Sequence, residues 1–153
     1  MTNLAPIIVF CYNRPEHLEQ TLDALSRNEL ADQSTLYIYC DGPKEGASEE
    51  MLQKIADVRQ VARKRQWCKE VHIVEAEKNK GLANSIIGGV TDVINKRGKV
   101  FVLEDDLVSS PHMLKFVNKA LDFYEDYTGV FSISVNRPPL SKMQIPDDYP
   151  YDV

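Results

Sequence analysis

The segment "KVFVLEDDLVSSP", residues 99–111, joins a short apolar run to three consecutive carboxylates. The run 100–103 contains β-branched and aromatic side chains, a composition typical of a buried strand. It ends directly in Glu104, Asp105 and Asp106, called here the acidic triplet, and apolar residues resume immediately after them. This return of apolar character indicates that the three carboxylates are held in a defined position at a strand end.

Other short runs have the same strand character. They are rich in β-branched and aromatic residues and are bounded by polar or turn-forming residues. Together with residues 99–104, the predicted strands are residues 6–12, 35–40, 70–76 and 129–135.

Helical patterns separate these runs. Apolar residues recur at helical spacing after Pro15, after Ser48, between Leu82 and Gly98, and after Pro111. Strands that alternate with helices and are almost continuously apolar predict a mostly parallel sheet covered by helices on both faces. We therefore expect an α/β fold in the order βαβαβαβαβ.

The length and composition limit the kind of protein. The chain has 153 residues, about the size of one average domain. Its hydrophobic fraction of 43% and charged fraction of 27% are those of a globular protein. The net charge of -5 argues against binding to nucleic acid or to an anionic membrane, because both attract an excess of Lys and Arg. We expect one domain over residues 1–135. Residues 136–153 form a Pro-rich tail whose apolar residues show neither the strand nor the helix period.

The three cysteines are isolated in the sequence and show no metal-ligand spacing. We interpret Cys11, Cys40 and Cys68 as buried free thiols in a reducing compartment. The sequence shows neither a signal-peptide pattern nor an apolar run of about 18 residues. We therefore expect a cytoplasmic location and no transmembrane segment, with the provision that a longer parent protein could attach the domain to a membrane.

One edge of the predicted sheet is unusually polar. Ligands of open parallel sheets bind beyond the carboxyl ends of the strands. The first four predicted strands run into "CYNRP", "CDGPKEG", "AEKNKGLANS" and "EDDLVSSP", all rich in Asp, Asn, Gly or Glu. This rim is therefore predicted to bind a polar ligand.

The acidic triplet favours a metal at that rim. Successive side chains of an extended segment point to opposite sides, so Glu104 and Asp106 are expected on one side and Asp105 on the other. Carboxylates this close repel one another, and a hard cation lowers that cost. Mg²⁺ is usually held by one or two protein carboxylates and by phosphate oxygens of a substrate. The alternative is that the carboxylates are solvated and cap the following segment.

Four of these segments together resemble a known family. "IIVFCYNRP", "YIYCDGP", "NKGLANSIIGGV" and "VFVLEDDLVSSP" are similar to the nucleotide-sugar-binding half of family 2 glycosyltransferases of the GT-A fold. The form "LEDDL", followed by "SP" and "FSISVNRP", resembles the N-acetylglucosaminyltransferase I type, which has EDD in place of DxD. The resemblance covers about residues 5–138 and implies a Rossmann-like GT-A fold.

The resemblance implies roles for residues after the first three strands. Tyr12 and Arg14 match the segment that lines the uridine pocket, and Asp41 matches the carboxylate that bonds the imide or ribose of the nucleotide. The alternatives are core packing for Tyr12, a solvated cation for Arg14 and a turn for Asp41, whose two roles are compatible.

The segment "NKGLANS" matches the family pattern NxGxxxARN with one residue fewer and without its arginine. The match implies that Asn79, Gly81 and Asn84 line the donor side of the site. Gly81 would permit close approach of the backbone, and the two amides would supply donors and acceptors. The alternative is that Asn79 is simply the N-cap of the following helix.

For the acidic triplet, the resemblance implies that Asp106 binds the metal, Mn²⁺ or Mg²⁺. Glu104 and Asp105 would then bind the ribose, the sugar or metal-bound water. His112 follows closely but is not included among the metal ligands, because a lone His near a helix start is more often a surface residue.

The implied activity is metal-assisted transfer of a sugar from a nucleotide-diphosphate sugar, with UDP as the expected nucleotide, to an acceptor hydroxyl. The acceptor would be a glycan or a lipid-linked molecule. The general base is expected beyond residue 153, in an acceptor-binding half that the tail would begin, so this part alone should have little activity. A non-catalytic nucleotide-sugar-binding domain with a relic site is the alternative.

Other enzyme classes with a similar sheet fit the sequence less well. A nucleotidyltransferase usually carries a Gly-rich loop after the first strand, and a dinucleotide-dependent dehydrogenase carries GxGxxG there. The segment "CYNRPEH" contains no glycine. It also lacks the aspartate that a phosphoacceptor receiver or an Asp-based phosphatase would need at this place.

Overall fold

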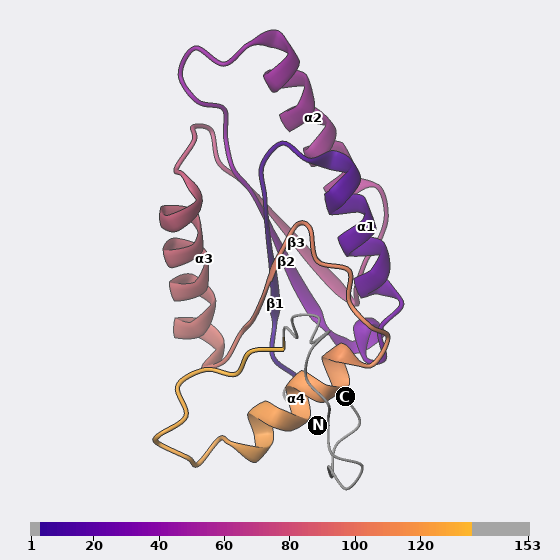
Figure 1. Ribbon diagram of the computed structural model, residues 1–153, viewed down its shortest axis with the longest axis vertical. Coiled ribbons are helices and arrows are strands. Elements are labelled where there is room, and N and C mark those ends of the chain that lie inside the picture. The colour runs from indigo at the N-terminus through magenta and orange to yellow at the C-terminus, as the bar shows by residue number, and fades with distance from the viewer. Residues whose placement is uncertain (1–3, 136–153) are drawn as a thin grey trace, which may run out of the picture.

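The computed structural model describes residues 4–135, and within them the chain forms one parallel sheet with helices on both faces (Figure 1). The sheet has four strands in the order β3-β2-β1-β4. The strands are β1 (Ile7–Cys11), β2 (Thr35–Cys40), β3 (Glu70–Glu75) and β4 (Phe101–Glu104). The helices are α1 (Pro15–Ser26), the 3₁₀ helix η1 (Ala31–Gln33), α2 (Glu49–Arg63), α3 (Leu82–Arg97) and α4 (Met113–Phe123). The predicted α/β class and parallel sheet are confirmed.

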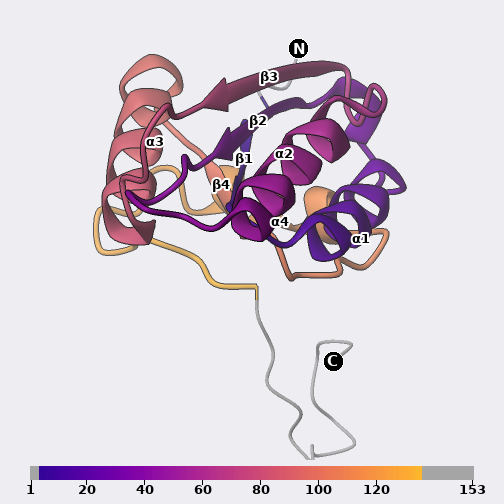
Figure 2. The same ribbon diagram turned by 90° about the horizontal axis from the view of Figure 1, so that it is seen from above.

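The central strand β1 explains why the two faces are covered. All five of its residues are buried, and their side chains alternate between two cores. Ile7 and Val9 belong to the larger core, which is completed by residues of α1, α2 and α4. Ile8 and Phe10 face the smaller core with Val93 of α3. Figure 2 shows α3 on one side of the sheet and α1 and α2 on the other.

Helix boundaries follow local signals in the sequence. Pro15 is the first residue of α1, where its missing amide hydrogen costs nothing. The side chain of Ser48 caps α2 by accepting a hydrogen bond from the amide of Met51 at 3.3 Å. Gly98 ends α3 in the left-handed conformation, with φ of 78°. These three boundaries agree with the predicted helices.

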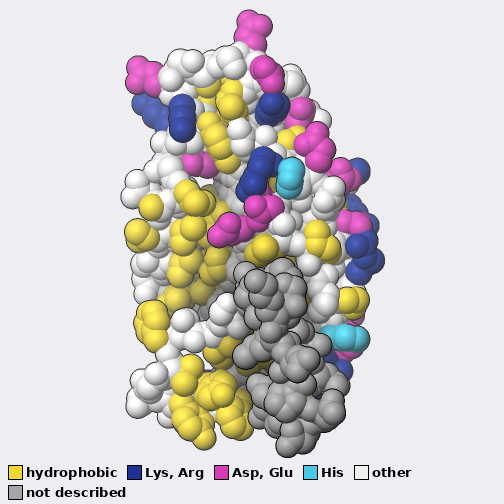
Figure 3. Space-filling model, in the orientation of Figure 1, with side chains coloured by type: hydrophobic (Ala, Val, Ile, Leu, Met, Phe, Trp, Pro, Cys, Tyr) yellow, Lys and Arg dark blue, Asp and Glu magenta, His cyan; other side chains and the backbone are white. Residues whose placement is uncertain are grey.

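The fifth predicted strand, residues 129–135, is absent from the sheet. Among the described residues, the strand pairings join β1 to β2, β1 to β4 and β2 to β3, and residues 129–135 take part in none of them. Phe131 has a relative exposure of 102%, so this apolar side chain packs against nothing in residues 4–135. Figure 3 shows hydrophobic side chains at the surface around this region and over α3. A strand pattern alone forms no strand, because the ladder hydrogen bonds need a neighbouring strand.

The predicted tail, residues 136–153, lies outside the described residues, and the predicted domain boundary at residue 135 stays a prediction. Within the described part, no helix is both long and apolar enough to cross a membrane.

Candidate functional site

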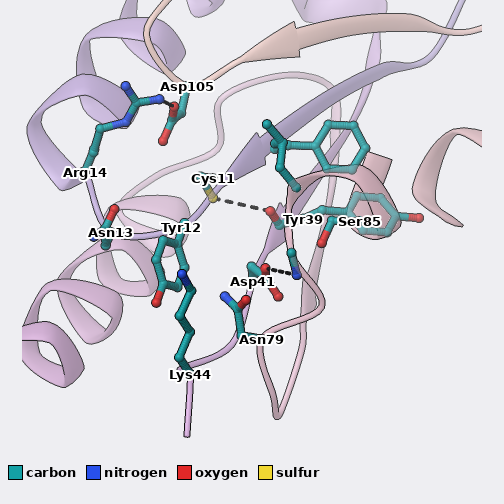
Figure 4. A pocket seen from close by; sticks show the side chains of 13 residues that line it. Cys11, Tyr12, Asn13, Arg14, Tyr39, Asp41, Lys44, Asn79, Ser85 and Asp105 are labelled. Carbon is teal, nitrogen blue, oxygen red and sulfur yellow. Dashed lines mark hydrogen bonds and ion pairs between the residues drawn. The ribbon is translucent and has the colours of Figure 1, made fainter. Parts of the chain in front are cut away.

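A cavity of about 350 Å³ lies at the carboxyl ends of β1 and β2, beside the start of α3. Figure 4 shows its lining side chains, with Arg14 and Asp105 on one side and Tyr12, Lys44 and Asn79 together on another. Of the predicted site residues, the cavity is lined by Tyr12, Arg14, Asp41, Asn79, Gly81 and Asp105. Side chains from segments up to 93 residues apart in sequence therefore meet at the predicted rim.

Asp41 connects the end of β2 to the loop before α3. Its Oδ1 accepts the backbone amides of Gly42 and Lys80, each at 2.8 Å, and its Oδ2 accepts that of Gly81 at 3.1 Å. The residue is 9% exposed, so these bonds stand in for water. Three of the roughly four acceptor positions of a carboxylate are thus used by the protein, which leaves Oδ2 able to accept one more donor.

Asn79 fixes the same loop from the other side. Its Nδ2 donates to the carbonyl of Gly42 at 3.0 Å, and its backbone amide donates to the carbonyl of Pro43 at 3.0 Å. Helix α3 begins at Leu82 after Gly81, with no side-chain cap. The alternative interpretation of Asn79 as the N-cap is therefore wrong.

Two glycines shape this loop for different reasons. Gly81 has φ of 77°, which favours glycine, while a Cβ there would have nothing within 4 Å. Gly42 is the position of close approach, because a Cβ would lie 2.6 Å from backbone atoms of Lys78. The close approach between two protein segments at Gly42 was not predicted, and the predicted close approach of the Gly81 backbone to the donor stays a prediction.

Asn84 lies away from the main cavity. Its Nδ2 donates to the carbonyl of Lys80 at 2.9 Å, one turn earlier in the chain. It lines a smaller neighbouring cavity of about 110 Å³, which shares Tyr39, Asp41 and Ser85 with the main one. Its predicted contact with the donor stays a prediction.

The exposure of the acidic triplet alternates as predicted, but Asp105 and Asp106 lie in a turn after β4 and contact the same arginine, Arg14, so they do not face opposite sides. Asp105 is 4% exposed, whereas Glu104 and Asp106 are exposed. Among the described residues that line the main cavity, only Asp105 comes from the triplet. Three adjacent carboxylates therefore occupy two different environments.

Arg14 is the partner of the triplet. Its Nη2 donates to Oδ1 of Asp105, and its Nη1 donates to Oδ2 of Asp106 at 3.1 Å. Burial raises the pKa of Asp105 above its ordinary value, and the hydrogen bond from Arg14 opposes that rise. The same hydrogen bond to Asp105 raises the pKa of Arg14, so the guanidinium remains charged.

The donor set at the rim fits a metal that takes part of its ligands from a substrate. Within residues 4–135, no group of three or more His, Cys, Asp or Glu side chains is placed to hold an ion. Asp106 nevertheless presents an exposed carboxylate beside the cavity residue Asp105, which is the one-or-two-carboxylate arrangement that suits Mg²⁺ bound with phosphates. His112 is paired with Glu29 at 2.6 Å, and its exclusion from the metal ligands stays a prediction.

Several lining residues were not predicted. Asn13, Lys44 and Ser85 add polar groups to the cavity, and Tyr39 adds an aromatic ring. Lys44 lies in "CDGPKEG", one of the rim segments, and its charge was the available signal. Tyr39 was not predicted, because it lies within the apolar run of β2 and the sequence does not show which side chains of that strand border the cavity.

The architecture resembles that of a solved structure. The crystal structure of TarS from S. aureus is similar to this chain with a TM-score of 0.51 and 14% sequence identity. The similar region covers 80% of this chain and 20% of TarS, so the chain spans about one fifth of that protein's length. At this identity the likeness concerns the fold, which is the Rossmann-like α/β fold of GT-A glycosyltransferases.

The sequence then places the chain within a family. Residues 7–145 match the model of glycosyl transferase family 2, and the chain belongs to that family. No curated protein matches the sequence.

Proposed function

We propose that this chain is the donor-binding part of a glycosyltransferase that takes a sugar from a UDP-sugar and transfers it, with Mn²⁺ or Mg²⁺, to an acceptor hydroxyl. The observation that carries the proposal is the cavity at the carboxyl ends of β1 and β2, where Arg14, Asp41 and Asp105 meet. Family membership supports glycosyl transfer in general. The choice of UDP, the metal and the acceptor class, a glycan or a lipid-linked molecule, belongs to the proposal.

The cavity has groups for each part of a nucleoside diphosphate. The ring of Tyr12 offers a flat surface for a base, and the free acceptor position of Asp41 suits an imide or ribose donor. Arg14 and Lys44 bring positive charge to the same cavity, where they would neutralise phosphates. A base, a ribose and a diphosphate can therefore each find a chemical partner.

Asp106 would hold the metal, with Glu104 and Asp105 orienting the ribose, the sugar or metal-bound water. Once bound, the metal would offset negative charge on the departing diphosphate. Asn79 keeps the loops at the cavity in place through Gly42, and Gly81 turns the chain into α3. The role of general base is assigned to no residue within 4–135.

Calorimetric titration with UDP, GDP and CDP, each with and without Mn²⁺, tests the proposal. We expect UDP to bind most tightly and to depend on the metal. Asp106→Ala should weaken metal-dependent binding at least about tenfold, because even outer-sphere changes at metal sites cost that much. Asp126→Ala, an exposed carboxylate beyond α4, is the control and should bind as the wild type does.

Two results would contradict the proposal. If Asp106→Ala binds UDP and Mn²⁺ unchanged, Asp106 has no metal role, and if no nucleotide binds, the cavity is not a donor site. The alternative of a non-catalytic binding domain makes a different prediction. It expects UDP-sugars to bind without being hydrolysed. A donor site of a transferase should instead hydrolyse the UDP-sugar slowly in the presence of metal, with water accepting the sugar and UDP leaving.

A further inference from the structure

Arg14 joins two segments that are far apart in the chain. It precedes Pro15 at the start of α1, yet its guanidinium donates to Asp105 and Asp106, which follow β4. The side chain of Arg14 is 45% exposed, so water and solutes can reach it. Through this pairing the loop after β1 and the loop after β4 share one cation.

The two carboxylates differ in how easily they can give up that cation. The side chain of Asp105 is 5% exposed, and a buried carboxylate that loses its partner pays a large desolvation cost. The side chain of Asp106 is 38% exposed, so water can replace a lost partner at little cost. The contact with Asp105 is therefore an anchor, and the contact with Asp106 is exchangeable.

A metal ion and the guanidinium compete for Asp106. A metal ligand must direct a carboxylate oxygen at the ion, and Oδ2 of Asp106 already accepts Nη1 of Arg14 at 3.1 Å. A doubly charged ion at this place would also be repelled by the adjacent positive charge. In the free protein, a metal bound through Oδ2 would therefore displace one arm of Arg14, and a metal bound through Oδ1 would still face the repulsion of the adjacent guanidinium.

We propose that Arg14 occupies Asp106 until the donor binds, and that this arm then moves from Asp106 to the donor diphosphate as the metal takes its place. The planar guanidinium has several donors in a fixed fork, so one arm can stay on Asp105 while the other changes partner. Arg14 thereby couples the metal to the nucleotide and disfavours metal binding in the absence of donor. This inference rests on the proposed function and adds a role for Arg14 within it.

Thermodynamic linkage makes the coupling measurable from either ligand. If UDP strengthens Mn²⁺ binding by some factor, Mn²⁺ strengthens UDP binding by the same factor. Part of that factor comes from direct contact of metal and phosphate, which does not need Arg14. The other part comes from moving Arg14 away from Asp106, and only this part should disappear when Arg14 is replaced.

The test measures free Mn²⁺ by electron paramagnetic resonance during titration of the protein, with and without saturating UDP. The variants are Arg14→Gln, which removes the charge, and Arg14→Lys, which keeps a cation beside Asp105 but lacks the second arm. Arg27→Gln is the matched control, because Arg27 pairs with Asp23 on α1 and lies outside the cavity lining. Fluorescence of Trp67, which is buried, confirms that each variant is folded.

We expect Arg14→Gln to bind Mn²⁺ alone about three- to tenfold more tightly than the wild type, the order expected when one positive charge is removed near a divalent ion in water. The strengthening by UDP should shrink by a similar factor. Arg14→Lys should change in the same direction by less, so it answers the question even if Arg14→Gln does not fold. Arg27→Gln should behave as the wild type.

Weaker or unchanged Mn²⁺ binding in both Arg14 variants would overturn the inference. If Arg14 only orients the carboxylates, its replacement should lower the affinity for Mn²⁺. The coupling must also fall: unchanged coupling in both variants overturns the inference as well. Such results leave the proposed function standing, provided that wild type binds UDP with Mn²⁺. If the wild type binds no nucleotide with Mn²⁺, the proposed function itself fails.

Discussion

The Asp41 carboxylate at the end of β2 accepts the backbone amide of Gly81, 40 residues further along the chain, at 3.1 Å. The same carboxylate accepts the amide of Lys80 at 2.8 Å. Asp41 therefore determines the position of the loop that enters α3, whether or not it also touches a ligand. A carboxylate that looks like a ligand group in the sequence is also a structural element of the cavity.

Asp41→Asn should destabilise the protein and weaken nucleotide binding together. The amide has one acceptor oxygen, so its NH₂ group would face a backbone N–H that also donates. An unsatisfied buried group costs about 1–3 kcal/mol, which urea unfolding followed by Trp67 fluorescence would measure. Asp57→Asn is the control, because Asp57 is partly buried and accepts a hydrogen bond from Gln53 within α2. Full stability of Asp41→Asn would show that the loop does not depend on this carboxylate.

Gly42→Ala should also disturb the cavity, for a steric reason. Its Cβ would lie 2.6 Å from the backbone of Lys78, so the two loops must separate. We expect a loss of about 1–3 kcal/mol in unfolding free energy and weaker UDP binding. Gly88→Ala in α3 has open space around its Cβ and should instead gain about 0.5–1 kcal/mol from helix propensity. Equal stabilities of the two variants would contradict this account of the loops.

Lys44→Gln should weaken binding of UDP about three- to tenfold while leaving binding of uridine unchanged, because an exposed lysine at the cavity acts on phosphate through its charge. Calorimetry with both ligands at two salt concentrations separates the charge effect from a shape effect. Lys54→Gln, which removes a lysine paired with Glu50 on α2, is the matched control. A loss of uridine affinity in Lys44→Gln would place the lysine near the base instead.

The cysteines should be unreactive in the folded protein. All three are free and buried, and burial raises the pKa of Cys68 to about 12. A hydrogen bond between the thiols of Cys11 and Cys40, together with burial, also raises the pKa of Cys11. Only the thiolate reacts with a thiol reagent, so the native protein should be labelled slowly at pH 8. In urea, all three cysteines should be labelled. Rapid labelling of the native protein would contradict this expectation.

The local part of the site could be predicted from the sequence. Tyr12, Arg14 and Asp41 follow strands whose apolar runs are easy to recognise, and the carboxyl ends of parallel strands share one edge of the sheet. The alternating exposure of the acidic triplet was also predicted, but Asp105 and Asp106 lie in a turn after β4 and share Arg14, so they do not face opposite sides. These predictions depend on periodicity and chain direction, which the sequence contains.

Long-range contacts were less accessible. Nothing in "CDGPKEG" indicates that Gly42 lies against the backbone of Lys78. The prediction of a fifth strand was wrong for the same reason, because the pattern of residues 129–135 does not show whether a neighbouring strand is present.

The sequence by itself determined the alternation of strands and helices, the polar rim and the family, because these depend on local pattern and on the order of motifs along the chain. Only the tertiary structure decided that Asp41 holds the loop before α3 and that Arg14 is shared between Asp105 and Asp106. Each of these contacts joins residues at least 39 positions apart. Which distant residues come into contact depends on how the helices pack against the sheet, and the local pattern of apolar residues does not determine that packing.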